Sequence, residues 1–305
     1  MDSAELHLFY EDLVRKLRNR GVVCAITSGL ACVHYGIAET TKDCDLLCHS
    51  DFFDTLLGLL GETLVDGKPC GYRGQISPPL SARWHRGGWT SHFEWETEPQ
   101  ATTLDVFGYA VRQSSPWEHE LSGLYAGMNV VAEMKRTSRD KDWPFITSLG
   151  TEMLRERDSR GWLHLFDADE FIELQQEFSI PGDMVAVRPS LKLAINGDPK
   201  LAGALFAERV FWQELDRMRT RIYRAALRPF VLAMGRAGTS KEAGLGEQHR
   251  GRVACAEASL KPNPMKDLGL ERLVEDARVA TAALINPEMI QWLPNVRPYF
   301  MHLEP

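Results

Sequence analysis

The segment that most restricts how this chain can fold is residues 42–48, KDCDLLC, in which polar and apolar positions alternate. Such alternation is typical of a β-strand with one buried face. Asp43 and Asp45 are two positions apart, so a strand projects both carboxylates from one face, with Cα atoms about 7 Å apart. Two carboxylates this close repel each other unless a cation lies between them. The segment therefore predicts a cation site on a strand.

A third carboxylate belongs to a second predicted strand, Thr102–Tyr109, with sequence TTLDVFGY. Leu104, Val106 and Gly108 fall on one face, and Asp105 falls on the other. If this strand pairs beside the first, Asp105 can complete a two-metal site with Asp43 and Asp45. Carboxylate oxygens suit Mg²⁺ or Mn²⁺, which also hold triphosphate oxygens.

Two further features fit a phosphate ligand. Ser28 and Gly29 lie between a predicted strand and a short predicted helix, where exposed backbone N–H groups favour a phosphate. Glycine at position 29 also permits close approach of the backbone. Lys135 and Arg139 are four residues apart on a predicted helix, where both cations are placed to neutralise triphosphate charge.

Together these segments resemble the polymerase-beta-like nucleotidyltransferase superfamily, particularly its uncharacterised bacterial and toxin-related branches. The resemblance is carried by ITSGLACVHYG and TTKDCDLL, then by TTLDVFGY and the helix EMKRTSRDKDW, over about residues 20 to 150. Two positions depart from the family pattern. Ser28 stands where the first glycine of a pair is common, and Glu39 stands where many relatives carry arginine, which removes a positive charge near the site.

The resemblance implies an enzyme that uses a nucleoside triphosphate (NTP) as donor. Asp43 and Asp45 would hold the metal that grips the β- and γ-phosphates. Asp105 would share a second metal and help to deprotonate the acceptor hydroxyl. Ser28, Gly29, Lys135 and Arg139 would contact the phosphates, and positioning and charge neutralisation would supply most of the catalysis.

The expected fold class is α+β, with a small mixed β-sheet flanked by helices and then a mainly helical region. The predicted strands are concentrated in the first 110 residues, so we expect a nucleotidyltransferase-like catalytic domain over residues 1–150. A helical domain follows over residues 151–305, with a long amphipathic helix over 199–233. Residues 235–252 are rich in glycine and predict a surface loop.

Charge limits the choice of partners. With a formal net charge of −7 and a pI near 5.8, the chain does not bind nucleic acid through its bulk charge. Any such contact needs a local patch. The candidate patch is a stripe on the long helix that could follow an RNA backbone, although an ordinary solvated helix face is the more common explanation; its residues are Arg217, Arg221, Arg224 and Arg228.

Other groupings carry weaker signals. Cys44, Cys48 and His49 are the nearest approach to a zinc-type cluster, but buried thiols explain the cysteines better. The segment RWHRGGWTSHFEW could stack a base, though core packing is the more common role of such aromatics. Its two histidines, His85 and His92, are isolated, and isolated histidines are usually structural, so neither is assigned a role.

The N-terminus shows no signal peptide, and no apolar run approaches 18 residues. We therefore expect a cytoplasmic protein with no membrane partner. Two alternatives to the enzyme hypothesis remain: a non-catalytic nucleotide- or RNA-binding module, as in a toxin–antitoxin or defence pair, and an enzyme that modifies a small molecule such as an antibiotic. The sequence identifies neither the acceptor, the preferred base of the NTP, nor the oligomeric state.

Overall fold

The computed structural model describes residues 3–110, 121–238 and 242–297. The described residues pack into two compact units. The first contains 3–110, 121–127, 222–238 and 242–267, and the second contains 128–221 and 268–297. These packing units do not coincide with the expected domains 1–150 and 151–305. The assignment of a catalytic domain and a helical domain to those two ranges stays a prediction.

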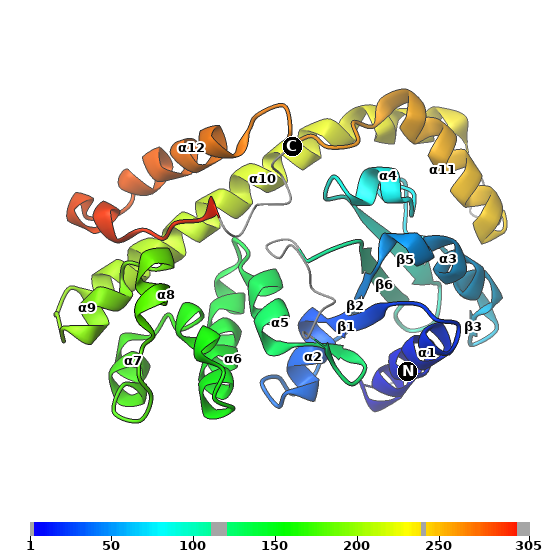
Figure 1. Cartoon of the computed structure of the whole chain (residues 1–305). Helices are drawn as coiled ribbons and strands as arrows, with labels where there is room; N and C mark the ends of the chain where they lie inside the picture. The colour runs from blue at the N-terminus through cyan, green and yellow to red at the C-terminus, as the bar shows by residue number, and fades with distance from the viewer. Residues whose placement is uncertain (1–2, 111–120, 239–241, 298–305) are drawn as a thin grey trace. The chain divides into compact units, whose positions relative to one another are not determined.

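The first unit is built on a mixed β-sheet, which confirms the α+β class. The described strands are ordered β3-β4-β5-β6-β2-β1-β8-β7 across the sheet. Figure 1 shows β5, β6, β2 and β1 at its centre. β2 is antiparallel to β1 and parallel to β6. The bounds are β1 Cys24–Thr27, β2 Cys44–Cys48, β3 Leu64–Val65, β4 Lys68–Tyr72, β5 Thr90–Trp95, β6 Thr102–Phe107, β7 Leu121–Ser122 and β8 Tyr125–Ala126.

Burial along the strands follows the sequence pattern. β5 and β6 alternate buried and half-buried positions along their whole length, as expected when one face packs on the core. β1 is buried at every position, because it lies inside the sheet. β2 is buried except at Asp45, so this carboxylate lies on the accessible face of an otherwise apolar strand.

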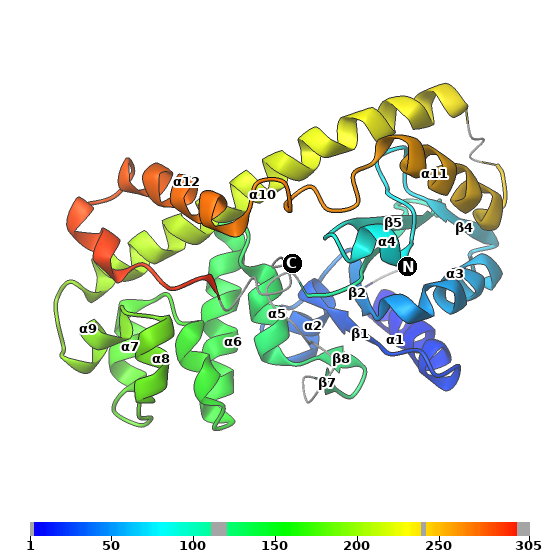
Figure 2. The same cartoon turned by 45° about the horizontal axis from the view of Figure 1, so that its top comes forward.

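Helices cover the sheet of the first unit. In α1, Tyr10, Leu13 and Leu17 are buried at helical spacing, and the Tyr10 hydroxyl donates to the Thr103 carbonyl of β6 at 2.5 Å. α11 packs against α3 and β4, and it runs beside α3 in both views (Figures 1 and 2). The bounds are α1 Ser3–Asn19, α2 Ser28–His34, α3 Phe53–Glu62, α4 Ala82–His85 and α11 Leu245–Ser259, with the short 3-10 helix η1 at Ser50–Phe52.

The tryptophans of residues 83–95 belong to the core rather than to an exposed stacking surface. Trp84 and Trp89 are buried in a cluster with Phe230 and Met234. Each indole N–H is satisfied by a backbone carbonyl, Trp84 by Leu260 at 3.2 Å and Trp89 by Lys261 at 2.9 Å. Core packing is therefore the role of these aromatics.

The second unit is helical in its described residues, as expected for the later part of the chain, and α5 and α6 lie side by side in it (Figure 2). It also contains the first part of α10, Leu201–Ala237. The other bounds are α5 Met128–Lys135, η2 Asp140–Asp142, α6 Trp143–Arg155, η3 Ser159–Leu163, α7 Ala168–Leu174, α8 Gly182–Val187, α9 Leu191–Ile195, α12 Leu270–Ala282 and η4 Pro287–Trp292.

A buried ion pair joins α10 to the chain around η3. The Arg188 guanidinium donates to Glu208 at 2.9 Å and to the Trp162 and Leu165 carbonyls at 2.6 Å each. Both charged side chains are 1% exposed. Each of the three nitrogens of this buried guanidinium has an acceptor. The contacts therefore hold these segments of the second unit together, and no buried charge is left unpaired.

The predicted long helix exists, but it is longer than expected and ends at Ala237. Residues 201–221 belong to the second unit and 222–237 to the first. The predicted loop over 235–252 is wrong at both ends, because α10 continues to Ala237 and α11 begins at Leu245. None of the described helices combines the length and the apolar composition that crossing a bilayer requires.

Candidate active site

Two of the three predicted carboxylates are direct neighbours in the sheet. Asp45 of β2 and Asp105 of β6 are register partners on parallel strands, so their side chains leave the same face. Both are half-buried. The pairing of β2 with β6, which the sequence only suggested, thus brings these two aspartates together.

Asp43 lies just before β2 rather than on it, because the strand begins at Cys44. This corrects the expectation that both aspartates are strand residues. Asp43 is exposed, and the Thr41 hydroxyl donates to its Oδ1 at 3.2 Å. It therefore stands at the entrance to the strand that carries Asp45.

Gly29 is packed against the same threonine. A Cβ at this position would lie 2.5 Å from Thr41 Oγ1, so only glycine fits without a shift. Ser28 has a φ of 56°, a left-handed conformation that is uncommon for serine. It is also the first residue of α2, which follows β1 directly. The structure thus ties the start of α2 to Asp43 through Thr41, whereas the role of Ser28 and Gly29 in phosphate binding stays a prediction.

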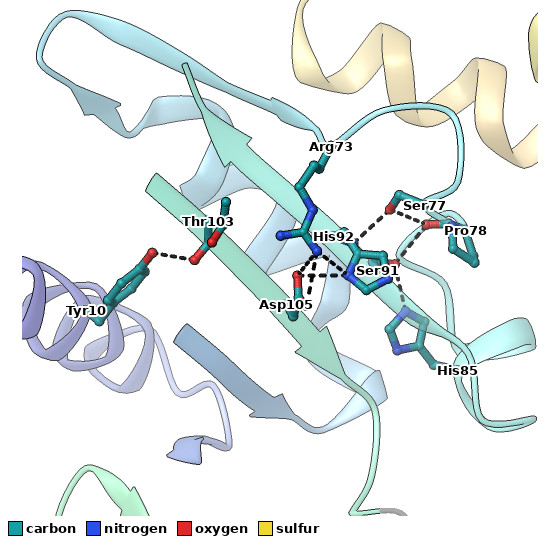
Figure 3. A network of polar contacts seen from close by, with 9 residues as sticks. All are labelled: Tyr10, Arg73, Ser77, Pro78, His85, Ser91, His92, Thr103 and Asp105. Atoms are coloured by element: carbon teal, nitrogen blue, oxygen red, sulfur yellow. Dashed lines mark hydrogen bonds and ion pairs between the residues drawn. The ribbon is translucent and has the colours of Figure 1, made fainter. Parts of the chain in front are cut away.

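Two residues that sequence reasoning did not assign complete the row of side chains (Figure 3). His92 of β5 is the register partner of Asp105, and its Nδ1 lies 2.8 Å from Asp105 Oδ1. Arg73, directly after β4, donates from Nη2 to Asp105 Oδ1 at 2.8 Å and to Oδ2 at 3.2 Å. Arg73 Nη2 also lies 3.1 Å from His92 Nδ1, so the carboxylate, the imidazole and the guanidinium form one polar cluster.

The loop that follows Arg73 is held from several sides. The Arg73 N–H donates to the His92 carbonyl at 2.9 Å, and the His92 N–H donates to Ser77 Oγ at 2.8 Å. Arg252 of α11 donates to the Ser77 carbonyl at 2.9 Å and to the Gly74 carbonyl at 2.7 Å. The backbone that carries Arg73 is therefore anchored to β5 and α11.

His85 lies next to this site but serves the core. It is fully buried, and its Nε2 donates to Ser91 Oγ at 2.8 Å, while that hydroxyl donates to the Pro78 carbonyl at 3.0 Å (Figure 3). Burial lowers the pKa of His85 to about 3, so it is neutral in the folded protein. This agrees with the structural role that is usual for an isolated histidine.

The expected helix carrying Lys135 and Arg139 is wrong in its extent. α5 ends at Lys135, and Arg139 lies beyond it in an extended conformation before η2. Both cations contact the buried Asp142, with Lys135 Nζ at 3.9 Å from Oδ1 and Arg139 Nε at 2.7 Å from Oδ2. They belong to the second unit, and their predicted contact with a triphosphate stays a prediction.

Across the part of the chain that the structure describes, no three His, Cys, Asp or Glu side chains are grouped as a ready-made metal cage. Cys44 and Cys48 are buried thiols whose pKa is raised by burial, which disfavours the thiolate that binds zinc. The donor set of Asp43, Asp45 and Asp105 nevertheless suits a hard divalent cation, because two of these carboxylates share a register position and the third is two residues away.

Comparisons with known protein families, curated proteins and solved structures gave no significant match for this chain.

Proposed function

We propose that this chain is a metal-dependent nucleotidyltransferase, which transfers a nucleoside monophosphate from an NTP to a hydroxyl acceptor. The observation that carries the proposal is the register between Asp45 and Asp105. It aligns two carboxylates on one accessible sheet face, with Asp43 two residues before the first. This arrangement is the one expected for a nucleotidyltransferase fold, and it therefore supports the proposal.

The chemistry assigns different tasks to the three carboxylates. Asp43 and Asp45 would hold Mg²⁺ or Mn²⁺, joined by Asp105, and the bound cation supplies charge neutralisation of the phosphates. The acceptor oxygen attacks the α-phosphorus in line, the bond from that phosphorus to the bridging oxygen breaks, and pyrophosphate leaves. A carboxylate oxygen of Asp105 accepts the proton of the acceptor hydroxyl.

The acceptor we favour is RNA. The arginines of the α10 stripe are all exposed, as a surface that follows a phosphate backbone requires; they are Arg217, Arg221, Arg224 and Arg228. Arg217 already pairs with Glu214 on the same helix, so the other three are the stronger candidates.

The test is incubation with each α-labelled NTP, Mg²⁺ or Mn²⁺, and total RNA, protein extract or the chain itself as acceptor. We expect label transfer from at least one NTP, and loss of transfer in Asp43→Ala and Asp45→Asn. Asp54→Asn is the matched control, because Asp54 is an exposed aspartate of α3 in the same unit. Equal labelling by Asp45→Asn and the control would refute the metal site.

A second candidate function is a non-catalytic nucleotide- or RNA-binding module. The contacts of Arg73 and His92 with Asp105 favour it, because they already engage a carboxylate that the enzyme needs for a metal. NTP binding that depends on metal, without transfer to any acceptor, supports the module over the enzyme.

A further inference from the structure

Arg73 and Asp105 form an ion pair inside the proposed site. A single guanidinium nitrogen, Nη2, contacts both oxygens of Asp105, at 2.8 and 3.2 Å. The Arg73 side chain is 34% exposed and that of Asp105 is 22% exposed, so solvent reaches the pair. The other two nitrogens of this guanidinium, Nε and Nη1, meet no acceptor among the described residues.

The pair has a clear electrostatic origin. Asp45 and Asp105 are register neighbours, so their negative charges repel each other unless positive charge is close. Arg73 supplies that charge from the end of β4. A divalent cation that binds Asp105 must compete with this guanidinium for the same two oxygens.

The surroundings of Arg73 let its side chain leave while its backbone stays. The Arg73 N–H is bonded to β5, and the next turn is bonded to Arg252 of α11. Among the described residues, the side chain itself is held at its tip, by Asp105 and by a 3.1 Å contact with His92 Nδ1. Rotation about its side-chain bonds therefore releases Asp105 without unfolding the loop.

We propose that Arg73 exchanges Asp105 for a substrate phosphate when the metal–nucleotide complex binds. The proposal rests on the function proposed above and adds how the substrate enters. A guanidinium is suited to the task, because its planar N–H groups bind phosphate oxygens in pairs. One internal ion pair opens and two new ones form, between Asp105 and the cation and between Arg73 and a phosphate, so no charge is left unpaired.

The exchange has a consequence that simple metal binding lacks. A cation alone must displace Arg73 and leave its charge without a partner, and a nucleotide alone must approach three carboxylates. Each ligand therefore binds weakly alone, and the two bind strongly together. In thermodynamic terms the cation and the nucleotide are positively coupled, and Arg73 is the origin of the coupling.

The test measures Mn²⁺ binding by the loss of the free Mn²⁺ signal in electron paramagnetic resonance, with and without a non-hydrolysable ATP analogue. Arg73→Met keeps the length of the side chain and removes its charge. We expect it to bind Mn²⁺ alone about tenfold more tightly than the wild type, because the competitor is gone. The same variant should bind the Mn²⁺–analogue complex about tenfold more weakly, because the phosphate partner is also gone. In both measurements, the affinity of Arg73→Lys should lie between that of the wild type and that of Arg73→Met.

Two controls separate the exchange from bulk charge and from the neighbouring histidine. Arg86→Met removes one positive charge at an exposed position of the same unit and should change Mn²⁺ affinity less than about twofold in physiological salt. His92→Gln removes the other partner of Asp105 and should leave the coupling in place. Unchanged or weaker Mn²⁺ binding by Arg73→Met would overturn the exchange.

Asp45→Asn distinguishes failure of the exchange from failure of the proposed function. If this variant binds Mn²⁺ as the wild type does, the metal site itself is refuted and the exchange falls with it. If Asp45→Asn loses Mn²⁺ binding but Arg73→Met gains none, the metal site stands and only the exchange is refuted. Thermal melts of each variant, with and without Mn²⁺, verify that the chain is folded in every comparison.

Discussion

At the scale of single residues, the most constrained contact of the site is the one between Gly29 and Thr41. It fixes the start of α2 against the segment that leads into β2. The same threonine hydroxyl reaches Asp43, so a change at position 29 is transmitted to a carboxylate that does not touch it. Packing of this kind leaves no space for a methyl group.

Gly29→Ala should therefore destabilise the protein by about 1–3 kcal/mol, the usual cost of an added methyl group in a packed site. Urea unfolding measures the loss. Thr41→Ala in the same chain should recover part of it, because the clashing hydroxyl is then absent. Gly58→Ala is the control: this exposed glycine of α3 has open space around its Cβ position, and alanine should be neutral or stabilising there. Equal losses at positions 29 and 58 would contradict the packing argument.

At the scale of elements, the turn between α5 and α6 is stabilised by Lys135 and Arg139, the two cations that the sequence predicts to contact a triphosphate. Asp142 is 3% exposed in its side chain and accepts hydrogen bonds from Thr137 at 2.6 Å and from Arg139 at 2.7 Å. Lys135 is buried beside it, with its Nζ 5.1 Å from the centre of the Phe145 ring. Asp142 thus connects Thr137, Arg139 and Lys135 across the turn that separates α5 from α6.

Asp142→Asn should cost about 3 kcal/mol of unfolding free energy, because it leaves the buried Lys135 without its counter-ion. Arg139→Gln should cost less than about 1 kcal/mol, since the Arg139 side chain is exposed. Lys135→Met should leave the affinity for a fluorescent ATP analogue unchanged if Lys135 serves the turn. A large loss of nucleotide affinity in a stably folded Lys135→Met variant would instead support the predicted contact between Lys135 and a phosphate.

The elements also show which parts of the fold can be predicted from sequence. β2, β6 and α10 are recognisable because their apolar residues recur at the period of a strand or a helix. α11 was mistaken for a loop because its glycines lower helix propensity, but its Gln248 and Arg252 are fixed by hydrogen bonds to β4 and to the turn after it. Long-range bonds of this kind outweigh local propensity.

The candidate site also contains residues that the sequence predicts and one that it does not. Asp43, Asp45 and Asp105 were found from local patterns, because each lies in or beside a strand with a clear period. Arg73 was missed because the stretch around it, rich in glycine and proline, has no period, and its approach to Asp105 depends on the pairing of β4, β5 and β6. Strand order is set by non-local packing, which single-residue patterns do not encode.

At the scale of the whole molecule, the exposed stripe on α10 is the feature that contrasts most with the acidic net charge. Polyanion binding by an acidic protein needs positive charge concentrated along one surface. Arg221, Arg224 and Arg228 recur along this helix and are exposed. If they contact phosphates, each contact releases counter-ions, and affinity then depends steeply on salt.

Replacing all three with glutamine should lower the salt dependence of RNA binding, reducing the slope of log K against log salt by about 2 for a single strand. Filter binding at several salt concentrations measures the slope. The matched control replaces three surface arginines that are already paired with acidic residues, which changes the net charge equally; they are Arg20, Arg155 and Arg272. Equal slopes for the two triple variants would show that the stripe is an ordinary solvated face.

The interleaving of the two units along the chain has a consequence during synthesis. The sheet strands are complete by residue 126, but Arg252, which bonds the turn after β4, comes much later in the chain. At ordinary translation rates the ribosome needs on the order of ten seconds to bridge that interval. For most of it, until residues 230 and 234 have been made, Trp84 and Trp89 lack their partners Phe230 and Met234. The nascent chain therefore carries an uncovered aromatic surface, of the kind that chaperones bind, until the first unit closes.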